Sequence, residues 1–236
     1  MQKLYQDCEE CGAYNISIFS NCTPEQMDKI TASKTCSHYK KGQHIFYVDN
    51  IPLGVYCICK GIVKLVKTNN DGKEQILRFA QQGEFLGYRA LIADEPLVST
   101  AICIEDTIAC FIPRKQFIEI MDENSSVSKH LLKSLSHELG VVEERVQSMA
   151  QKSVRERVAE TLLFLHATFK SDSKQDDSVI SITLPREDIA NIVGTATETV
   201  IRLLSEFKTV KLIAFEGKKI KILNKAGLEK ISNASL

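Results

Sequence analysis

The spacing of hydrophobic residues changes along the chain, from an extended pattern in its middle to helical patterns on either side. Between residues 39 and 113, short runs rich in β-branched and aromatic residues alternate with turn residues, and the clearest runs are 44–48, 55–59 and 61–66. Gly42 and the segment 69–72 supply glycine, asparagine and aspartate, which tight turns need for positive φ angles or side-chain capping. This pattern predicts an antiparallel β-roll or barrel.

Helical spacing replaces the strand pattern over residues 114–151. Six apolar residues follow one another at alternating intervals of three and four, which places them on one stripe of a helix. They are Leu132, Leu135, Leu139, Val142, Val146 and Met149. Because the residues between them are mostly polar, we expect the stripe to pair with the same helix of a second copy in a parallel dimer. Packing against the chain's own roll is the alternative.

Further elements are predicted on both sides of this helix. Residues 23–26 combine a threonine that can N-cap with a proline in the first turn, so a short helix should run to about residue 32. A longer helix should run from 152 to 169, followed by an exposed polar loop at 171–178. Residues 179–222 should form a strand, a helix, a turn, a helix and a hairpin. One face of the longer helix should carry Val158, Leu162, Leu165 and Phe169.

Two short helices separated by a glycine carry the clearest functional signal. Residues 184–194 end in Gly194, and 195–204 open a second helix almost at once, which is the spacing of a helix-turn-helix. In this motif the start of the second helix enters the major groove of double-stranded DNA. Arg202 can then pair with a guanine edge and Glu198 with a cytosine amino group. The candidate DNA-binding residues are Thr195, Thr197, Glu198, Ile201, Arg202 and Lys218.

A structural alternative exists for the same residues. Thr195 and Glu198 have the spacing of a capping box, and Glu198 with Arg202 has the spacing of an ion pair within a helix. The segment that follows favours DNA binding, because residues 202–225 hold seven Lys or Arg against two Glu, a local net charge of +5. Lys218 lies at the expected hairpin tip, where it suits phosphate contact.

Overall composition narrows the classes of protein that fit. The whole chain has 30 Lys or Arg and 30 Asp or Glu, so a nucleic-acid site must be local rather than a property of the net charge. The start of the sequence resembles no export signal and no apolar run is long enough to span a bilayer, so we expect no membrane contact and a cytoplasmic location. The eight cysteines should then be reduced thiols, metal ligands or redox centres.

The chain as a whole resembles Crp/Fnr family transcription regulators, and the match covers nearly everything after Ile18. The resemblance is carried by the segments 40–42, 83–88, 110–113 and 198–204. It implies a non-enzymatic homodimer that binds palindromic DNA, contacts RNA polymerase and is controlled through a roll like that of cyclic-nucleotide-binding domains. In the family, the residues matched by Glu198 and Arg202 contact a G·A-containing core in each half-site. Ile201 departs from the Fnr-type pattern, which has a small polar residue there.

The expected fold class is therefore α+β. Residues 1–22 should form a cysteine-bearing arm and 23–113 a jelly-roll-like β-roll that acts as sensor. Residues 114–151 should form a long dimerisation helix and 152–236 a winged helix-turn-helix.

The resemblance also bears on the signal that the roll receives. In members that respond to cyclic nucleotides, a Gly-Glu pair is followed by an arginine that neutralises the cyclic phosphate. Gly83 and Glu84 match the pair, but Ser99, before Thr100, occupies the arginine position. A phosphate without a cation in a partly buried pocket would be destabilised by several kcal/mol. This argues against control by cAMP and makes Glu84 a turn residue.

An iron–sulfur cluster is the other signal that the resemblance suggests. Cys110 matches the central cysteine of Fnr-type oxygen sensors, and Cys8, Cys11 and Cys22 lie in the arm, so these four are the candidate ligands. The family's third N-terminal cysteine has no counterpart between residues 12 and 21. Zinc, thiol redox chemistry, another ligand or none remain alternatives. The other four cysteines lie in or beside strand-like runs, where a buried thiol is expected: Cys36, Cys57, Cys59 and Cys103.

Two different classes of function stay open beside the DNA-binding regulator. The chain could be a small-molecule-binding signalling module whose C-terminal domain contacts other proteins. It could also use Cys8 and Cys11 as a thiol oxidoreductase centre, although this pair lacks the βαβ setting of such motifs. The sequence identifies neither the target genes nor whether they are activated or repressed.

Overall fold

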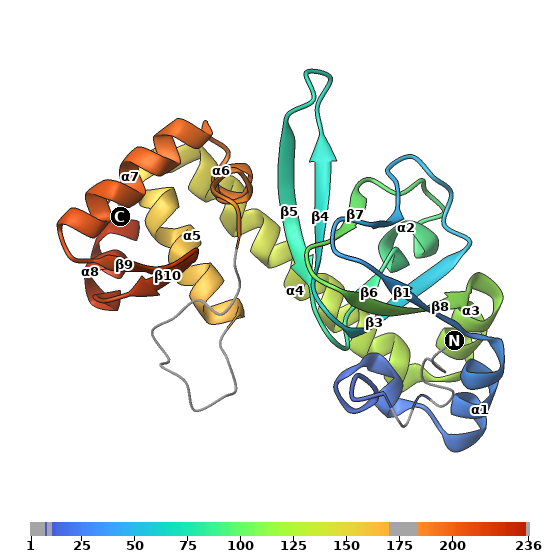
Figure 1. Cartoon of the computed structure of the whole chain (residues 1–236). Helices are drawn as coiled ribbons and strands as arrows, with labels where there is room; N and C mark the ends of the chain where they lie inside the picture. Colours follow the sequence, from blue (N-terminus) through green and yellow to red (C-terminus); the bar gives the residue numbers. More distant parts are fainter. Residues whose placement is uncertain (1–7, 9–10, 170–183, 235–236) are drawn as a thin grey trace. The chain divides into compact units, whose positions relative to one another are not determined.

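The computed structural model describes residues 8, 11–169 and 184–234, and these form two compact units (Figure 1). The first unit covers residues 1–139 and the second 140–236. The division falls inside helix α4, Ser125–Gln151, whereas the sequence placed the boundary at the end of that helix. No helix in the described part of the chain is long and apolar enough to cross a membrane.

The first unit is an antiparallel roll of two four-stranded sheets, with strand orders β1-β8-β3-β6 and β2-β7-β4-β5. This confirms the expected roll (Figure 1). The strands are β1 Thr35–Tyr39, β2 His44–Phe46, β3 Gly54–Lys60, β4 Val63–Thr68, β5 Glu74–Ala80, β6 Phe85–Leu86, β7 Thr100–Cys103 and β8 Thr107–Pro113. A short helix, α2 Tyr88–Ile92, follows β6.

The sheet that contains β3 and β8 is buried on both faces. Alternate residues of a strand point to opposite faces, so Ile58 joins one hydrophobic cluster with the other sheet. Cys57, Cys59 and Cys110 belong to a second cluster, which includes Phe19 and residues of the helices on that side. Burial on both faces explains why β3 and β8 are almost continuously apolar in sequence.

An N-terminal segment covers this second cluster. It consists of two 3-10 turns, Tyr14–Ile16 and Ile18–Asn21, and helix α1, Pro24–Ser33. Helix α1 begins with the predicted Thr23 cap and a proline in its first turn, and Gln26 completes a capping box with Thr23.

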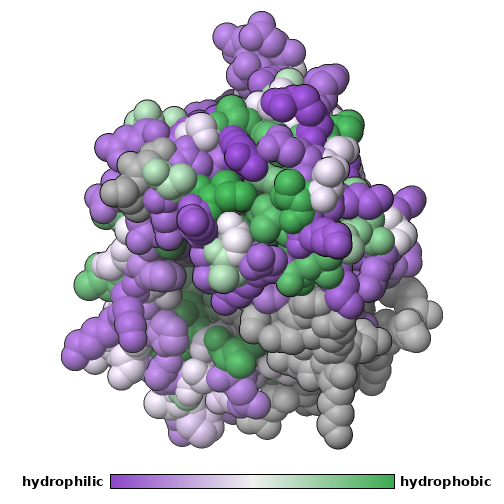
Figure 2. Space-filling view, turned by 90° about the vertical axis from the view of Figure 1, so that its left-hand side faces the viewer, coloured by the Kyte–Doolittle hydropathy of each residue, from purple (hydrophilic) through white to green (hydrophobic). Residues whose placement is uncertain are grey.

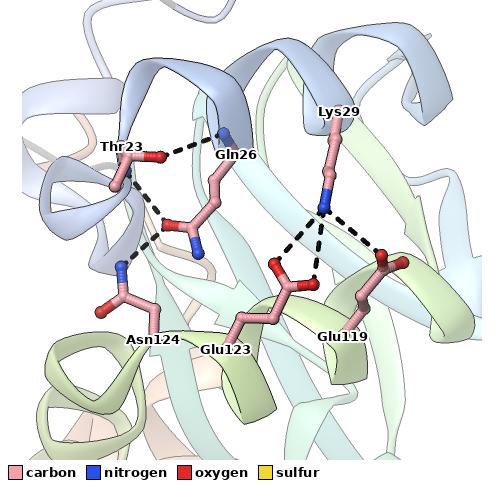
Figure 3. Close-up of polar contacts among 6 residues, drawn as sticks. All are labelled: Thr23, Gln26, Lys29, Glu119, Glu123 and Asn124. Carbon is pink, nitrogen blue, oxygen red and sulfur yellow. Dashed lines mark hydrogen bonds and ion pairs between the residues drawn. The ribbon is translucent and has the colours of Figure 1, made fainter.

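Helix α1 is joined to the helix that follows the roll, α3 Arg114–Glu123 (Figure 3). Lys29 Nζ lies 3.4 Å from a carboxylate oxygen of Glu119 and 3.3 Å from one of Glu123. Asn124 Nδ2 donates to Gln26 Oε1 at 2.9 Å and to the Asn21 carbonyl at 2.9 Å. The N-terminal segment is therefore bonded to the point where α3 ends and α4 begins.

The helical stretch that the sequence predicted over 114–151 is divided at Asn124. This residue ends α3 with extended backbone angles, and its Oδ1 accepts hydrogen bonds from the backbone N–H groups of Ser126 and Val127. An asparagine side chain that bonds nearby backbone competes with helical hydrogen bonding, which explains the break. Helix α4 then continues for 27 residues.

The second unit contains the predicted helix, helix-turn-helix and hairpin. Its elements after α4 are α5 Val154–Thr168, α6 Arg186–Val193, α7 Thr197–Thr209, β9 Ile213–Glu216, β10 Lys219–Ile222 and α8 Lys225–Ser232. The expected face of α5 is buried together with apolar residues of α7 such as Leu203 and Phe207. The polar loop predicted at 171–178, and the start of the strand predicted after it, lie outside the described residues.

Candidate functional site

The turn between α6 and α7 depends on Gly194. Its φ and ψ angles are 74° and 49°, a left-handed conformation that glycine adopts without a Cβ penalty. The N–H groups of Gly194 and Thr195 both donate to the Ala190 carbonyl, at 2.8 and 3.1 Å. These bonds satisfy the end of α6 and let α7 begin at Thr197, two residues after Thr195.

Helix α7 has one buried and one exposed face. Val200, Leu203, Leu204 and Phe207 are buried at helical spacing, so the opposite face is turned outward. Glu198, Ile201, Arg202 and Ser205 lie on that exposed face, and Thr197 is half-buried at its start.

The capping alternative for these residues does not match the structure. The N-cap of α7 is Ala196, with no side-chain cap, and Thr195 lies one residue before it. In the part of the chain that the structure describes, neither Glu198 nor Arg202 has an ion-pair or hydrogen-bond partner. Their charged groups are therefore free to contact a ligand.

Two arginines that the sequence analysis missed hold the helix-turn-helix in place. Arg145 Nη2 donates to the Ile192 carbonyl at 2.7 Å, and Arg157 Nε donates to the Val193 carbonyl at 3.2 Å. The last carbonyls of a helix lack partners within it and carry partial negative charge, so two guanidinium groups suit the end of α6. Arg157 also donates to the Lys152 carbonyl at 3.0 Å. In the sequence, Arg145 and Arg157 stand out only as charged residues next to apolar helix faces, which does not indicate that they contact α6.

A cluster of cations surrounds the hairpin. The Phe215 ring of β9 lies under the Arg186 guanidinium, 4.8 Å from ring centroid to Cζ, and Lys208 Nζ is 5.5 Å from the same centroid. Lys218 is exposed in the turn between β9 and β10. Figure 2 shows one face of the described residues, on which hydrophilic residues surround groups of hydrophobic ones.

In the first unit, the residues proposed as a ligand pocket make contacts within the roll. Glu84 Oε2 accepts a hydrogen bond from the Gln81 N–H at 2.7 Å, which makes it the turn residue that the sequence predicted. Ser99 is buried, and Thr100 Oγ1 accepts from the Val48 N–H at 3.1 Å. Gly83 has a φ of 86°, and a Cβ there would clash with Ile16.

A cation does lie near Glu84, but it is already engaged. Arg78 Nη2 donates to the Phe85 carbonyl at 3.1 Å and lies 3.7 Å from Glu138 Oε1 of α4. Tyr88 is buried and forms a hydrogen bond with Glu138. Burial is the larger of the two causes that raise the pKa of the Tyr88 phenol, and the bond with Glu138 is the other. These contacts join the 83–88 segment to α4 within the first unit.

Five cysteines line one small cavity of about 20 Å³ in the second cluster: Cys8, Cys11, Cys57, Cys59 and Cys110. Cys110 forms a disulfide with Cys36, its direct partner across β1 and β8. The Cys59 sulfur lies 3.2 Å from the Cys110 sulfur. A hydrogen bond with Cys59 lowers the pKa of the Cys11 thiol to about 6, and burial raises the pKa of Cys57.

Three of the four predicted cluster ligands meet at this cavity. Cys22 is not among its lining residues, and burial raises the pKa of its thiol to about 11. Cys110 is held in the disulfide, and no three His, Cys, Asp or Glu side chains within the described ranges are grouped as metal ligands. The structure therefore brings Cys8, Cys11 and Cys110 to one cavity without Cys22, and the iron–sulfur cluster stays a prediction.

Other residues of the cavity were not singled out from the sequence. Lys34 also lines it, and its buried Nζ has no hydrogen-bond partner within the described structure. Cys57 and Cys59 were expected to be ordinary buried thiols. Their spacing of two on one strand was the signal that both face the same side.

The apolar stripe of α4 is largely exposed. Leu132, Leu139, Val142 and Val146 are between 56 and 65% exposed, and Met149 is 39% exposed. Leu135 differs, because it packs against the second cluster of the roll with Val127 and Leu131. The helix therefore contacts the roll through Leu135, and pairing of the exposed part of the stripe with a second copy stays a prediction.

Two family profiles match the chain. Residues 36–124 match a cyclic nucleotide-binding domain, and residues 156–231 match a Crp-like helix-turn-helix domain.

Individual proteins match over almost the whole length. The fumarate and nitrate reduction regulatory protein of Vibrio cholerae is 27% identical over 231 residues, 97% of this chain and 91% of that protein. The anaerobic regulatory protein of Haemophilus influenzae is 26% identical over 231 residues, which are 97% of this chain and 88% of that protein. The structure of FixK2 from Bradyrhizobium japonicum has a TM-score of 0.75 at 25% identity, covering 86% of this chain and 99% of that one.

Proposed function

The chain belongs to the Crp/Fnr family of DNA-binding transcription regulators, and on this premise we propose that it acts as a homodimer on a palindromic DNA site under a redox signal received by the roll. The observation that carries the proposal is the exposed face of α7, where Glu198 and Arg202 have no partner within the described structure.

The exposed face of α7 has the chemistry needed to discriminate bases. Arg202 can donate two hydrogen bonds to a guanine, and Glu198 can accept one from a cytosine amino group. Ile201 lies between them and is 49% exposed, so it offers an apolar contact of the kind that suits a thymine methyl group. We expect the base opposite Ile201 to distinguish this chain from relatives with a small polar residue there.

The cations around the hairpin suit the phosphate backbone rather than the bases. Lys218 is at the tip, while Arg186 and Lys208 are held over Phe215 at the side of the hairpin. Contacts to phosphate position a protein on DNA without selecting a sequence. The wing would therefore contribute affinity that depends on salt.

The α4 stripe supports the dimer. Five apolar side chains stay exposed at coiled-coil spacing, and a second copy is the partner that presents the same spacing. A parallel pair of α4 helices would give the dimer a two-fold axis, which suits a palindrome with half-sites one helical turn apart. Contact with RNA polymerase completes the proposed activity.

A redox signal fits the first unit better than cAMP does. Ser99 replaces the arginine that would neutralise the phosphate, and Arg78 is engaged by Glu138. The cysteine cavity offers several sulfurs in one place, and relatives of the chain include regulators named for anaerobic control. Thiol chemistry at this cavity is therefore our choice of signal.

Selection from a pool of random-sequence duplexes tests the DNA-binding proposal. We expect enrichment of an inverted repeat, and binding to it should weaken steeply as salt rises, with a negative log–log slope. A scrambled duplex of equal length serves as the control. Enrichment of no sequence, together with salt-independent binding, would contradict the proposal and favour the protein-contact alternative.

A further inference from the structure

Four cysteine sulfurs form a connected series through the first unit. Cys36 on β1 is bonded to Cys110 on β8, and the Cys110 sulfur lies 3.2 Å from that of Cys59 on β3. Cys59 in turn lines the same small cavity as Cys11 of the N-terminal segment. The series runs from β1 across the sheet order β1-β8-β3 to a segment far away in sequence.

We propose that Cys59 is the exchange thiol of a disulfide relay, which moves the disulfide from Cys36–Cys110 to Cys59–Cys110 and then to Cys11–Cys59. This inference gives a mechanism for the proposed redox signal, and it rests on the proposal that thiol chemistry in the roll supplies that signal. The relay needs no metal and uses sulfurs that are already adjacent. It also assigns a role to Cys59, which the resemblance does not.

Each step of the relay balances in atoms and electrons. In the first, the Cys59 sulfur attacks the Cys110 sulfur, the Cys36–Cys110 bond breaks, and Cys36 leaves and takes up the proton that Cys59 loses. In the second, the Cys11 sulfur attacks Cys59, the Cys59–Cys110 bond breaks, and Cys110 takes up the proton from Cys11. Each exchange makes one disulfide and breaks one, so no external oxidant or reductant is consumed.

The surroundings of the sulfurs place them together but act differently on the two attacking thiols. The cavity borders Cys11, Cys59 and Cys110 together, so successive attacks need no large movement of the strands. The Lys34 ammonium group lines the same cavity with no hydrogen-bond partner in the described structure. The contact with Cys11 and burial raise the pKa of the Cys59 thiol, and the Lys34 cation opposes this rise because a positive charge stabilises a thiolate. Cys36 is only half-buried, so water can reach the thiol that it becomes.

The last position of the disulfide would tether the N-terminal segment to β3. That segment packs on the second cluster through Ile18 and Phe19. It is also bonded to Asn124, where α4 begins. A covalent link at Cys11 therefore acts on a segment that contacts the start of the helix carrying the dimer stripe.

Disulfide mapping of the full-length protein tests the relay without using DNA. Oxidised protein is equilibrated at neutral pH, quenched with acid, alkylated and digested, and the linked peptides are identified by fragmentation in a mass spectrometer. We expect Cys36–Cys110, Cys59–Cys110 and Cys11–Cys59 links in one sample. Cys59→Ser should abolish both Cys59 links and leave only Cys36–Cys110. Cys103→Ser, which removes a buried thiol from the other cluster, should leave all three.

Two outcomes would overturn the relay. One is a Cys11 disulfide that persists in Cys59→Ser. The other is an unmodified protein whose Cys59 is fully alkylated under every condition. Iron and sulfide bound by Cys110 in the anaerobic form would be a third such outcome, beyond these two disulfide readouts. If Cys59→Ser does not fold, the unmodified protein still decides the question. The alkylated fraction of Cys36 must then equal the disulfide-linked fraction of Cys59. The experiment measures the position of the disulfide and not DNA binding. A protein that failed to bind DNA would therefore still give the same disulfide-linked peptides if the relay operates.

Discussion

Replacing Leu139 with alanine tests the proposed dimer most directly, since the structure sets the size of the effect. Leu139 is 59% exposed. Fully burying a leucine side chain contributes about 1.5–3 kcal/mol, so covering the exposed fraction contributes about 1–2 kcal/mol in each copy. Symmetry doubles this to about 2–4 kcal/mol, roughly a 30- to 900-fold increase in the dimer dissociation constant of Leu139→Ala.

Sedimentation equilibrium over a range of concentrations measures that constant. Val141→Ala is the matched control, because Val141 is 46% exposed on the same helix but lies outside the alternating spacing. We expect the control to dimerise like the unmodified protein. Equal dissociation constants for both variants would show that the stripe is not the interface. Val142→Asp should give monomer outright, because a charge in an apolar seam loses solvation without gaining a partner.

The remaining predictions concern residues of the second unit. Arg202→Ala should lower binding by about 1–3 kcal/mol per half-site at one base position, measured by fluorescence anisotropy against single-base variants of the duplex. Lys218→Ala should instead weaken all duplexes alike and reduce the salt slope by about two units, about one for each copy in the dimer. Equal losses on specific and scrambled DNA for Arg202→Ala would refute the base-reading role of Arg202. Gly194→Ala should lower the free energy of unfolding by about 1–2 kcal/mol in urea denaturation, because an alanine resists the left-handed conformation. Gly140→Ala, in a helix with open space around the added methyl group, should raise it by about 0.5–1 kcal/mol, and a loss of stability there would contradict this reasoning.

Local features of the sequence predicted most elements correctly. The Thr23 capping box, the glycine between α6 and α7 and the buried face of α5 all depend on residues within a few positions of each other. Helix caps, turns and periodicity act over that range, so a single sequence contains them. The break at Asn124 was missed because it depends on the Asn124 side chain, which bonds nearby backbone N–H groups in place of helical hydrogen bonds. The spacing of apolar residues does not reveal this competition.

Long-range pairing decided the rest. The sequence alone determined an antiparallel roll, an amphipathic helix and a helix-turn-helix with an exposed Glu198 and Arg202, because side-chain periodicity encodes which face is buried. Only the tertiary structure decided that Cys59 lies beside Cys110, since strand register and sheet order bring together residues 51 positions apart. It likewise placed Arg145 on the end of α6, 47 residues away. Such contacts depend on how separate elements pack, and no local pattern of the chain specifies them.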